Sequence, residues 1–296
     1  MLYVLDQDDW GYLVASLTDT LAKYANVPRM IIVGVINVDR NREMLPPLVR
    51  WPKAPASLSH AGGADDFLRY LTDEVMPFID ETYHAAPYRI LFGHSFGADF
   101  AMHAFSTRPL DSFNAFICMS ISAWYDSGAP LDRLRNNLQK LVKADETAAA
   151  AAATEPIKFY HTVGGEGGIM LQGAHQLLGI MESALHTNCN TGVTRIGKPG
   201  PARDLPELGK AQRCSRGTEK GEWFAEDKRH RVTYKFRPWY SESHHSQVFR
   251  GLEDGLRWIF QDHIRTVPVE SYSRLVTSEE ACKTGLCQPP SRAIVV

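Results

Sequence analysis

Long hydrophobic runs, cysteine clusters and an excess of charge of one sign are all absent from this sequence. No apolar segment approaches the roughly 20 residues that span a bilayer, so no membrane span is expected. The five cysteines include no C-x-x-C pair, and no paired histidines stand at zinc-ligand spacing, so no metal site is expected. A formal net charge of -2 without basic runs argues against nucleic acid as a partner. The expected ligand is therefore a small molecule.

Neither the N-terminus nor the cysteines fix the compartment. The N-terminal segment lacks the basic region and the small-residue cleavage site of a signal peptide, which favours the cytoplasm. The compartment stays open, because the chain begins inside an expected core strand and preceding residues could be missing. Cys118 lies in an apolar run and is expected to be a buried thiol. In an oxidising compartment two further pairs could form disulfides, Cys189 with Cys214 and Cys282 with Cys287.

Short apolar segments alternate with longer segments of helical pattern. Continuous apolar strands indicate a parallel sheet buried on both faces, and the alternation with helices is typical of an α/β fold. The expected strands are 2–5, 30–36, 89–95, 115–121, 157–163 and 231–240. The expected helices are 11–24, 64–82, 96–107, 130–150, 169–186 and 247–264. We therefore expect one α/β domain over residues 1–267.

Two segments carry no periodic pattern. Residues 187–228 are rich in Gly, Pro, Lys and Arg, so we expect a long loop inserted before the last strand. Loops of this length often act as lids or are mobile. Residues 268–296 show no clear packing pattern and are expected to form a peripheral C-terminal tail.

The sequence G-H-S-F-G at residues 93–97 lies between an expected strand and an expected helix. In that context G-x-S-x-G is the pattern of a nucleophile elbow, whose glycines let the strained serine turn pack against its neighbours. The helix would aim its free N–H groups at the site, so the Phe96 amide can act as an oxyanion donor. We predict that Ser95 is a nucleophile; the alternative is a serine in an ordinary strand-to-helix turn.

A serine nucleophile needs a base, which in this arrangement comes from a histidine after the last strand. His244 and His245 follow the expected strand 231–240 and precede the expected helix 247–264. Position alone leaves both as candidates. Other histidines precede that strand and are expected to be structural or surface residues: His161, His175 and His186.

The histidine should be oriented by a carboxylate that follows an earlier strand. Glu166, in the segment G-G-E-G-G, follows the expected strand 157–163 directly, and its glycines allow a tight loop. Asp126, after the expected strand 115–121, is the next candidate. Glu166 as a solvated loop residue and a serine–histidine pair without an acid are the remaining alternatives.

Seven segments together carry a resemblance that is more specific than the elbow alone. They are YVLD (3–6), VGVINVDRNREMLP (33–46), GGADDFLRYLTDEVMPFIDETY (62–83), GHSFGADFA (93–101), SISAWYD (120–126), VGGEGG (163–168) and ESHHS (242–246). With them the chain resembles the Putative esterase family of α/β-hydrolases, which includes esterase D-like enzymes, siderophore trilactone esterases, feruloyl esterases and mycolyltransferases. The likeness covers most of residues 2–186 and 230–262. It implies an α/β-hydrolase fold, a mostly parallel sheet flanked by helices.

The resemblance also assigns roles to single residues. The family pattern E-x-H-x-S selects His244 over its neighbour. The loop after YVLD would supply the second oxyanion amide at Gln7 or Asp8, and the donor stays open because relatives often have glycine in place of Gln7. Trp124 and Tyr125 match paired aromatics at the wall of the pocket, where an acyl or aryl group could stack; core packing is the alternative.

Three further residues lie beside the expected pocket. His94, within the elbow, is assigned to the substrate pocket. Asp39 and Arg40 lie in the V-D-R stretch of the family, where a structural salt bridge and a substrate contact are equally expected. Neither Asp39 nor Arg40 is assigned to catalysis.

The chain departs from the family at its start. Relatives usually have an antiparallel strand pair before YVLD, which is missing here. An edge of the sheet would then be exposed unless another segment or a second copy of the chain, in a homodimer, covers it. The loop 187–228 is also longer than the usual connection, which weakens substrate assignment from relatives.

We expect a serine carboxylic-ester hydrolase that acts on a small-molecule ester without cofactor or metal. Ser95 would attack the ester carbonyl, His244 would shuttle the proton, and water would release the acid from an acyl-enzyme. The alternatives are an acyltransferase, a thioester or peptide-bond hydrolase with the same residues, and a non-catalytic binding protein. The sequence does not determine the acyl group or the leaving alcohol of the ester.

Overall fold

The computed structural model describes residues 1–25, 27–51, 53–84, 86–107, 112–148, 157–185, 223–227, 232–261, 263 and 293–295. Cys118 is buried with a free thiol. The four cysteines considered for disulfides lie outside the described residues: Cys189, Cys214, Cys282 and Cys287. No helix in the described ranges is both long and apolar enough to cross a membrane.

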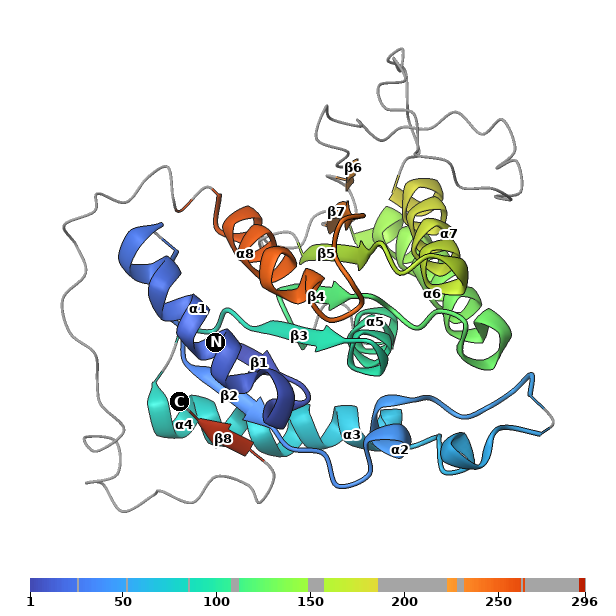
Figure 1. Cartoon of the computed structure of the whole chain (residues 1–296), viewed down its shortest axis with the longest axis horizontal. Coiled ribbons are helices and arrows are strands. Elements are labelled where there is room, and N and C mark those ends of the chain that lie inside the picture. The colour runs from blue at the N-terminus through green and yellow to red at the C-terminus, as the bar shows by residue number, and fades with distance from the viewer. Residues whose placement is uncertain are drawn as a thin grey trace, which may run out of the picture.

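In the described part of the chain, eight strands form one sheet in the order β6-β7-β5-β4-β3-β1-β2-β8 (Figure 1). The six central strands are parallel, and the edge strands β6 and β8 run antiparallel to their neighbours. The mostly parallel α/β sheet predicted from the sequence is confirmed. The strands are β1 (Leu2–Val4), β2 (Ile32–Val35), β3 (Ile90–His94), β4 (Ala115–Met119), β5 (Ile157–Gly164), β6 (Trp223–Asp227), β7 (Val232–Trp239) and β8 (Ala293–Val295).

Helices cover both faces of the sheet (Figure 1). One face packs against α1 (Gln7–Tyr24) and α8 (Gln247–Ile259). The other face is covered by α3 (Ala64–Tyr70), the π-helical turn η2 (Leu71–Val75), α4 (Met76–Tyr83), α5 (Phe96–Thr107), α6 (Ala129–Ala148) and α7 (Gly168–Leu185). Shorter helical turns lie in the connections: α2 (Arg40–Met44), η1 (Ala56–Leu58) and η3 (Tyr125–Gly128).

The central strands are apolar on both faces because each face has its own helical layer. On β1, Leu2 packs in the layer with α1 and α8, whereas the adjacent Tyr3 packs in the layer with α3 to α7. On β4, Ile117 and Cys118 divide between the same two layers. Successive side chains of a strand point to opposite faces, so a sheet buried on both sides needs an unbroken apolar run.

Helix α1 begins four residues earlier than the sequence pattern predicts. It starts at Gln7 rather than at residue 11, and Asp8 and Asp9 lie in its first turn. Carboxylates are favoured there by the positive end of the helix dipole. Gln7 and Asp8 are therefore helical residues instead of members of a loop after YVLD.

Both edge strands lie in segments for which no strand was expected. Strand β6 falls within the expected loop 187–228, and β8 falls within the expected tail 268–296. Strand β8 pairs with β2, with Val295 opposite Val33. Strand β8 therefore covers a sheet edge that would otherwise be exposed or be covered by a second copy of the chain. A three-residue strand is too short to show an alternating pattern, which is why the sequence did not reveal it.

Replacing a buried phenylalanine of the aromatic core should lower the free energy of unfolding far more than replacing an exposed one. Phe116 is fully buried and its ring packs against those of Phe105, Phe113 and Phe159. Phe116→Ala should lower the free energy of unfolding by about 3–5 kcal/mol, because a cavity replaces the ring. Phe249→Ala, at a side chain that is 56% exposed, should change it by less than about 0.5 kcal/mol. Urea unfolding of both variants measures this, and equal losses would contradict the packing.

Candidate active site

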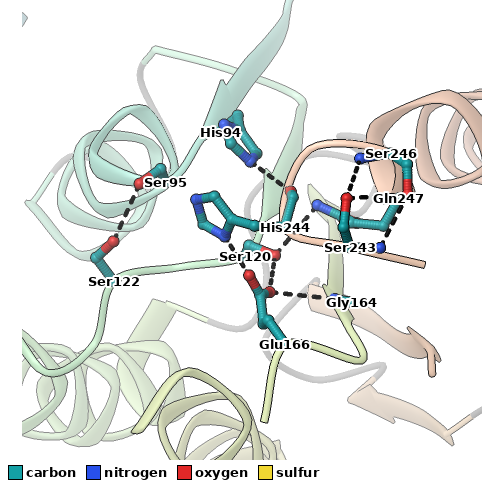
Figure 2. A network of polar contacts seen from close by, with 10 residues as sticks. All are labelled: His94, Ser95, Ser120, Ser122, Gly164, Glu166, Ser243, His244, Ser246 and Gln247. Carbon is teal, nitrogen blue, oxygen red and sulfur yellow. Dashed lines mark hydrogen bonds and ion pairs between the residues drawn. The ribbon is translucent and has the colours of Figure 1, made fainter. Parts of the chain in front are cut away.

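The candidate residues gather where parallel strands end. In α/β sheets the loops at the carboxyl ends of the strands form the usual binding crevice. Residues far apart in the sequence meet there, as Figure 2 shows for most of them. With the preceding strand in parentheses, they are Gln7 (β1), Ser95 (β3), Ser120 and Ser122 (β4), Glu166 (β5) and His244 (β7).

Ser95 occupies a sharp turn between β3 and α5. Its φ is 56°, in the left-handed region, and its N–H donates to the carbonyl oxygen of Met119 at 2.9 Å. A Cβ atom on Gly93 would lie 2.1 Å from the carbonyl oxygen of Gly97, so only glycine allows this turn. The first N–H groups of α5, that of Phe96 included, have no acceptor within the helix. They are available to a developing oxyanion at Ser95.

His244 and Glu166 are hydrogen-bonded to each other. His244 Nδ1 contacts Glu166 Oε2, and Figure 2 shows the imidazole between Ser95 and Glu166. The other carboxylate oxygen, Oε1, accepts from Ser120 Oγ at 2.5 Å and from the Gly164 N–H at 3.3 Å. Burial alone would raise the pKa of Glu166, but the hydrogen bonds from His244 and Ser120 outweigh it and hold this pKa below its ordinary value. Glu166 is therefore a carboxylate at neutral pH.

The hydroxyl groups around the pair extend this network. Ser120 Oγ, which donates to Glu166, accepts from Gln247 Nε2 at 3.2 Å at the start of α8. Ser95 Oγ lies 3.2 Å from Ser122 Oγ, with which it forms a hydrogen bond (Figure 2). Each oxygen of Glu166 thus has a partner, and the carboxylate is held in one orientation.

The loop that carries His244 packs directly on the loop that carries Glu166. The Gly165 N–H donates to the carbonyl oxygen of Glu242 at 2.6 Å. A Cβ atom on Gly165 would lie 2.0 Å from the carbonyl oxygen of Tyr240, so a larger residue would push the two loops apart. The glycines around Glu166 bring it within reach of His244.

His94, which the sequence assigns to the substrate pocket, supports His244 from the other side. It is only 3% exposed, and its Nε2 donates to the carbonyl oxygen of His244 at 2.8 Å. Because a carbonyl can only accept, Nε2 carries the proton. Burial, together with the nearby His244, lowers the pKa of His94 to about 3, so the ring is neutral at physiological pH.

His245 lies next to this group but takes a different position. It is exposed, and its ring stacks on Trp10 with 6.5 Å between centroids. Of the two histidines that position alone left open, His244 is the one that bonds Glu166. Among the described residues, no group of three or more His, Cys, Asp or Glu side chains is placed to hold a metal ion.

The two aromatic residues expected at the pocket wall differ in exposure. Tyr125 is fully buried and its hydroxyl donates to the Pro46 carbonyl oxygen at 2.7 Å, which corresponds to the core packing expected as the alternative to a pocket contact. Trp124 is half-buried, and its ring centroid lies 5.8 Å from that of Phe96 and 6.1 Å from that of Trp51. No pattern in the sequence selects Trp51, which lies in an irregular Pro-rich segment.

Asp126, the alternative acid, holds the Trp51 segment instead of a histidine. Its buried carboxylate accepts the backbone N–H groups of Val49, Arg50 and Trp51 at 2.7, 2.9 and 2.8 Å. These hydrogen bonds fix the segment that places Trp51 against Trp124. Asp126 therefore has a structural role, because it holds the segment that places Trp51 against Trp124.

The first turn of α1 lies beside the first turn of α5. Asp6 has a left-handed backbone, with φ and ψ both 52°, and its carbonyl oxygen accepts from Asp9 and Trp10 at 3.0 Å. The N–H groups of Gln7 and Asp8 come before these and have no acceptor within the helix. The Gln7 side chain is buried beside Gly11 and Gly34, where there is no side chain in its way. Both predicted amides therefore remain candidate oxyanion donors.

Asp39 and Arg40 do not pair with each other. Asp39 caps α2 by accepting the Arg42 N–H at 3.1 Å. Arg40 instead forms a salt bridge with Asp6, on the loop after β1. Arg40 thus forms a structural salt bridge, but its partner is Asp6 and not the neighbouring Asp39.

The chain belongs to the Putative esterase family, whose sequence model matches residues 1–178, more than half of the chain. The siderophore enterobactin esterase of Emericella nidulans is 36% identical over 77 residues, which are 25% of this chain and 25% of that protein. The siderophore triacetylfusarinine C esterase of Aspergillus fumigatus is 37% identical over 78 residues, 26% of each. The chain thus matches about a quarter of the length of these curated relatives.

Solved structures share the fold at low sequence identity. The IroE-like serine hydrolase of Shewanella oneidensis has a TM-score of 0.60 and 23% identity, over 88% of this chain and 70% of that one. The BES protein of Bacillus cereus has a TM-score of 0.61 and 21% identity, over 87% and 83%. The siderophore hydrolase EstB of Aspergillus nidulans has a TM-score of 0.59 and 18% identity, over 90% and 83%. These similarities extend the α/β-hydrolase fold over most of the chain.

The bond between Glu166 and His244 predicts a pH-dependent contribution to stability. Because the folded-state pKa of Glu166 is lowered, its carboxylate stabilises the native state above its unfolded pKa of about 4.3. That contribution is lost as pH falls through the folded-state pKa. The Tm difference between wild type and Glu166→Gln should therefore be largest near neutral pH and shrink in acid. Thermal unfolding across acidic and neutral pH measures it, with the exposed Glu253→Gln as control; a difference independent of pH would contradict the assignment.

Proposed function

We propose that this chain is a serine esterase in which Ser95 forms an acyl-enzyme, His244 is the general base and acid, and Glu166 orients His244. One observation carries the proposal. The imidazole of His244, bonded to Glu166, lies beside a serine in a left-handed turn at the start of a helix. Membership of an esterase family makes ester hydrolysis the chemistry that this arrangement would serve.

The Glu166 carboxylate would set the tautomer of His244. It can only accept, so Nδ1 carries the proton and Nε2 has a free electron pair. Nε2 takes the proton of Ser95 Oγ as the oxygen attacks the ester carbonyl. Because Ser95 Oγ bonds Ser122 in the free protein, the hydroxyl first rotates toward His244. Catalytic hydrogen bonds of this kind are often loose before substrate binds.

The tetrahedral intermediate would place its oxyanion between the first turns of α5 and α1. The Phe96 N–H is one donor, and the N–H of Gln7 or Asp8 is the other. The intermediate collapses when His244 gives its proton to the leaving alcohol, and the acyl group stays on Ser95. A water molecule then attacks the acyl-enzyme, His244 takes its proton, and the acid leaves as His244 returns this proton to Ser95.

The substrate we propose is a small-molecule ester with a flat apolar part. Phe96 and Trp124 form a partly exposed aromatic surface next to Ser95, and Trp51 extends it. Aromatic surfaces favour stacking with planar groups. Because the two curated relatives are siderophore esterases, siderophore esters are the first substrates to test.

Hydrolysis by four variants tests the proposal. Ser95→Ala and His244→Ala should each lower kcat by about 10⁴-fold or more, and Glu166→Gln by about 10³- to 10⁴-fold. His245→Ala, which removes the neighbouring imidazole, should leave kcat close to that of wild type. Release of p-nitrophenol from short, long and aryl esters gives the rates, and chromatography follows cleavage of a siderophore ester.

Two results would contradict the proposed roles. Hydrolysis that survives Ser95→Ala would exclude the acyl-enzyme on this serine. An inactive His245→Ala together with an active His244→Ala would show that His245, and not His244, is the general base. Circular dichroism of each variant separates these results from a loss of folding.

A further inference from the structure

Ser122 is the hydrogen-bond partner of Ser95 in the free protein. The two Oγ atoms lie 3.2 Å apart, and Figure 2 shows the Ser122 hydroxyl directed at Ser95 from the loop after β4. Ser122 is only 2% exposed, and hydrogen bonds are stronger where water is excluded. No step proposed above uses Ser122. A buried hydroxyl bonded to Ser95 Oγ can nevertheless affect every step in which the charge or the proton of that oxygen changes.

The sheet fixes the distance between the two serines. Ser95 directly follows β3, Ser122 lies three residues after β4, and His94 stands opposite Met119 where these strands pair. The Ser95 N–H donates to the carbonyl oxygen of Met119 at 2.9 Å. Ser95 therefore cannot move away from the loop after β4 without breaking contacts of the sheet itself.

The loop that carries Ser122 is held by bonds of its own. Ser120 has a left-handed φ of 46°, and its N–H donates to the carbonyl oxygen of Thr162 at 2.9 Å. Such a backbone persists only where its surroundings hold it in place. The Ser122 carbonyl oxygen accepts the Tyr125 N–H at 2.9 Å, which closes the next turn. Ser122 therefore keeps its place when Ser95 carries an acyl group.

The protons of the two hydroxyls decide which serine is the donor. A serine hydroxyl has one proton and two acceptor lone pairs. In the free protein either serine can donate to the other. When the Ser95 proton turns to His244, and again when Ser95 Oγ is part of an acyl ester, Ser95 has no proton to give to Ser122. Ser122 is then the donor, so the bond has a fixed direction in these states.

A donor at this position favours deacylation more than acylation. In deacylation, negative charge develops on Ser95 Oγ as it leaves the tetrahedral intermediate, and a hydrogen bond to that oxygen strengthens as the charge grows. In acylation the same bond already stabilises the free protein. An interaction that stabilises the starting state and the transition state alike does not change the rate. The gain is therefore largest where the acyl group leaves Ser95.

We infer that Ser122 is a further catalytic residue, which donates a hydrogen bond to Ser95 Oγ as this oxygen leaves the acyl group and thereby speeds deacylation. The inference rests on the proposed function, in which Ser95 carries the acyl group. Ser122 keeps its own proton throughout, and His244 returns to Ser95 the proton that it took from water. Loss of the Ser122 hydroxyl should slow deacylation and leave acylation at least as fast as before.

The test compares Ser122→Ala with Ser106→Ala. Ser106 is also buried, and its hydroxyl donates to the His103 carbonyl oxygen at 2.9 Å within α5, so it is a matched control for loss of a buried hydroxyl. The substrate is p-nitrophenyl acetate, whose good leaving group makes deacylation the slow step. Ser122→Ala should lower kcat about 10-fold, the size expected for a hydrogen bond to a charged group. KM should fall in proportion, so that kcat/KM stays at or above the wild-type value. Ser106→Ala should match wild type in both constants.

Stopped-flow kinetics separates the two steps. Ser122→Ala should release a stoichiometric burst of p-nitrophenol and then turn over slowly, while intact-protein mass spectrometry shows the acetyl-enzyme accumulating. Labelling by a fluorophosphonate, which requires attack by Ser95 but no deacylation, should be at least as fast as in wild type. Ser122→Cys, which places a weaker donor in a side chain of similar shape, should have a deacylation rate between those of Ser122→Ala and wild type.

Other results would overturn the inference. A purely structural role of Ser122 would lower kcat/KM, the labelling rate and the burst together. A role in acylation would slow labelling and abolish the burst. Unchanged kcat and burst in Ser122→Ala would show that Ser122 takes no part in the reaction. If circular dichroism shows that Ser122→Ala does not fold, Ser122→Cys decides the question, and deacylation at the wild-type rate in this variant would contradict the inference.

Failure of this inference can be told apart from failure of the proposed function. If wild type is not labelled at Ser95, or if Ser95→Ala still hydrolyses the ester, the proposed function fails and the role of Ser122 fails with it. If wild type forms an acetyl ester on Ser95 and Ser122→Ala releases the acetyl group at the wild-type rate, only the role of Ser122 is wrong.

Discussion

The close approach of the backbone at Gly93 and Gly97 determines where the chemistry of this molecule can take place. It forces the chain to leave β3 and enter α5 within one residue, so that Ser95 stands at the edge of the sheet with a left-handed backbone. The other parallel strands, including β1, β4, β5 and β7, end at the same edge of the sheet. Every other group proposed to act on Ser95 arrives from one of these ends.

The support of His244 shows how several weak restraints fix one side chain. Glu166 binds its ring, His94 binds its carbonyl oxygen, and Gly165 binds the neighbouring Glu242. These partners come from two different strands of the sheet, β3 and β5, so the loop cannot move without breaking contacts to both. Such preorganisation would place His244, the proposed base, before substrate arrives, which is where much of the rate gain of an enzyme originates.

The parts of the structure that follow from local pattern could be predicted from the sequence. The six parallel strands are visible as apolar runs, and the elbow follows from two glycines around a serine between a strand and a helix. The pairing of His244 with Glu166 agrees with chain order and family pattern, whereas their catalytic roles stay predictions. The sequence pattern places the start of α1 too late, since the first turn of this helix is polar and shows no apolar period.

Features that depend on where a side chain points could not be predicted. Trp124 and Tyr125 are adjacent in the sequence, but one is half-exposed and the other is fully buried. His94 lies beside Ser95 in sequence, but its ring is buried against His244 and binds the His244 carbonyl oxygen. The partner of Arg40 is 34 residues away, on another strand's loop. Only the three-dimensional packing decides such contacts.

Covalent labelling can show whether Ser95 is a nucleophile that His244 activates. Folded protein is incubated with a fluorophosphonate, digested, and the modified peptide is sequenced by mass spectrometry. We expect a single adduct on Ser95 in wild type and in His245→Ala, and much slower formation of this adduct in His244→Ala. An adduct on another serine, or labelling of Ser95 at the same rate without His244, would contradict it.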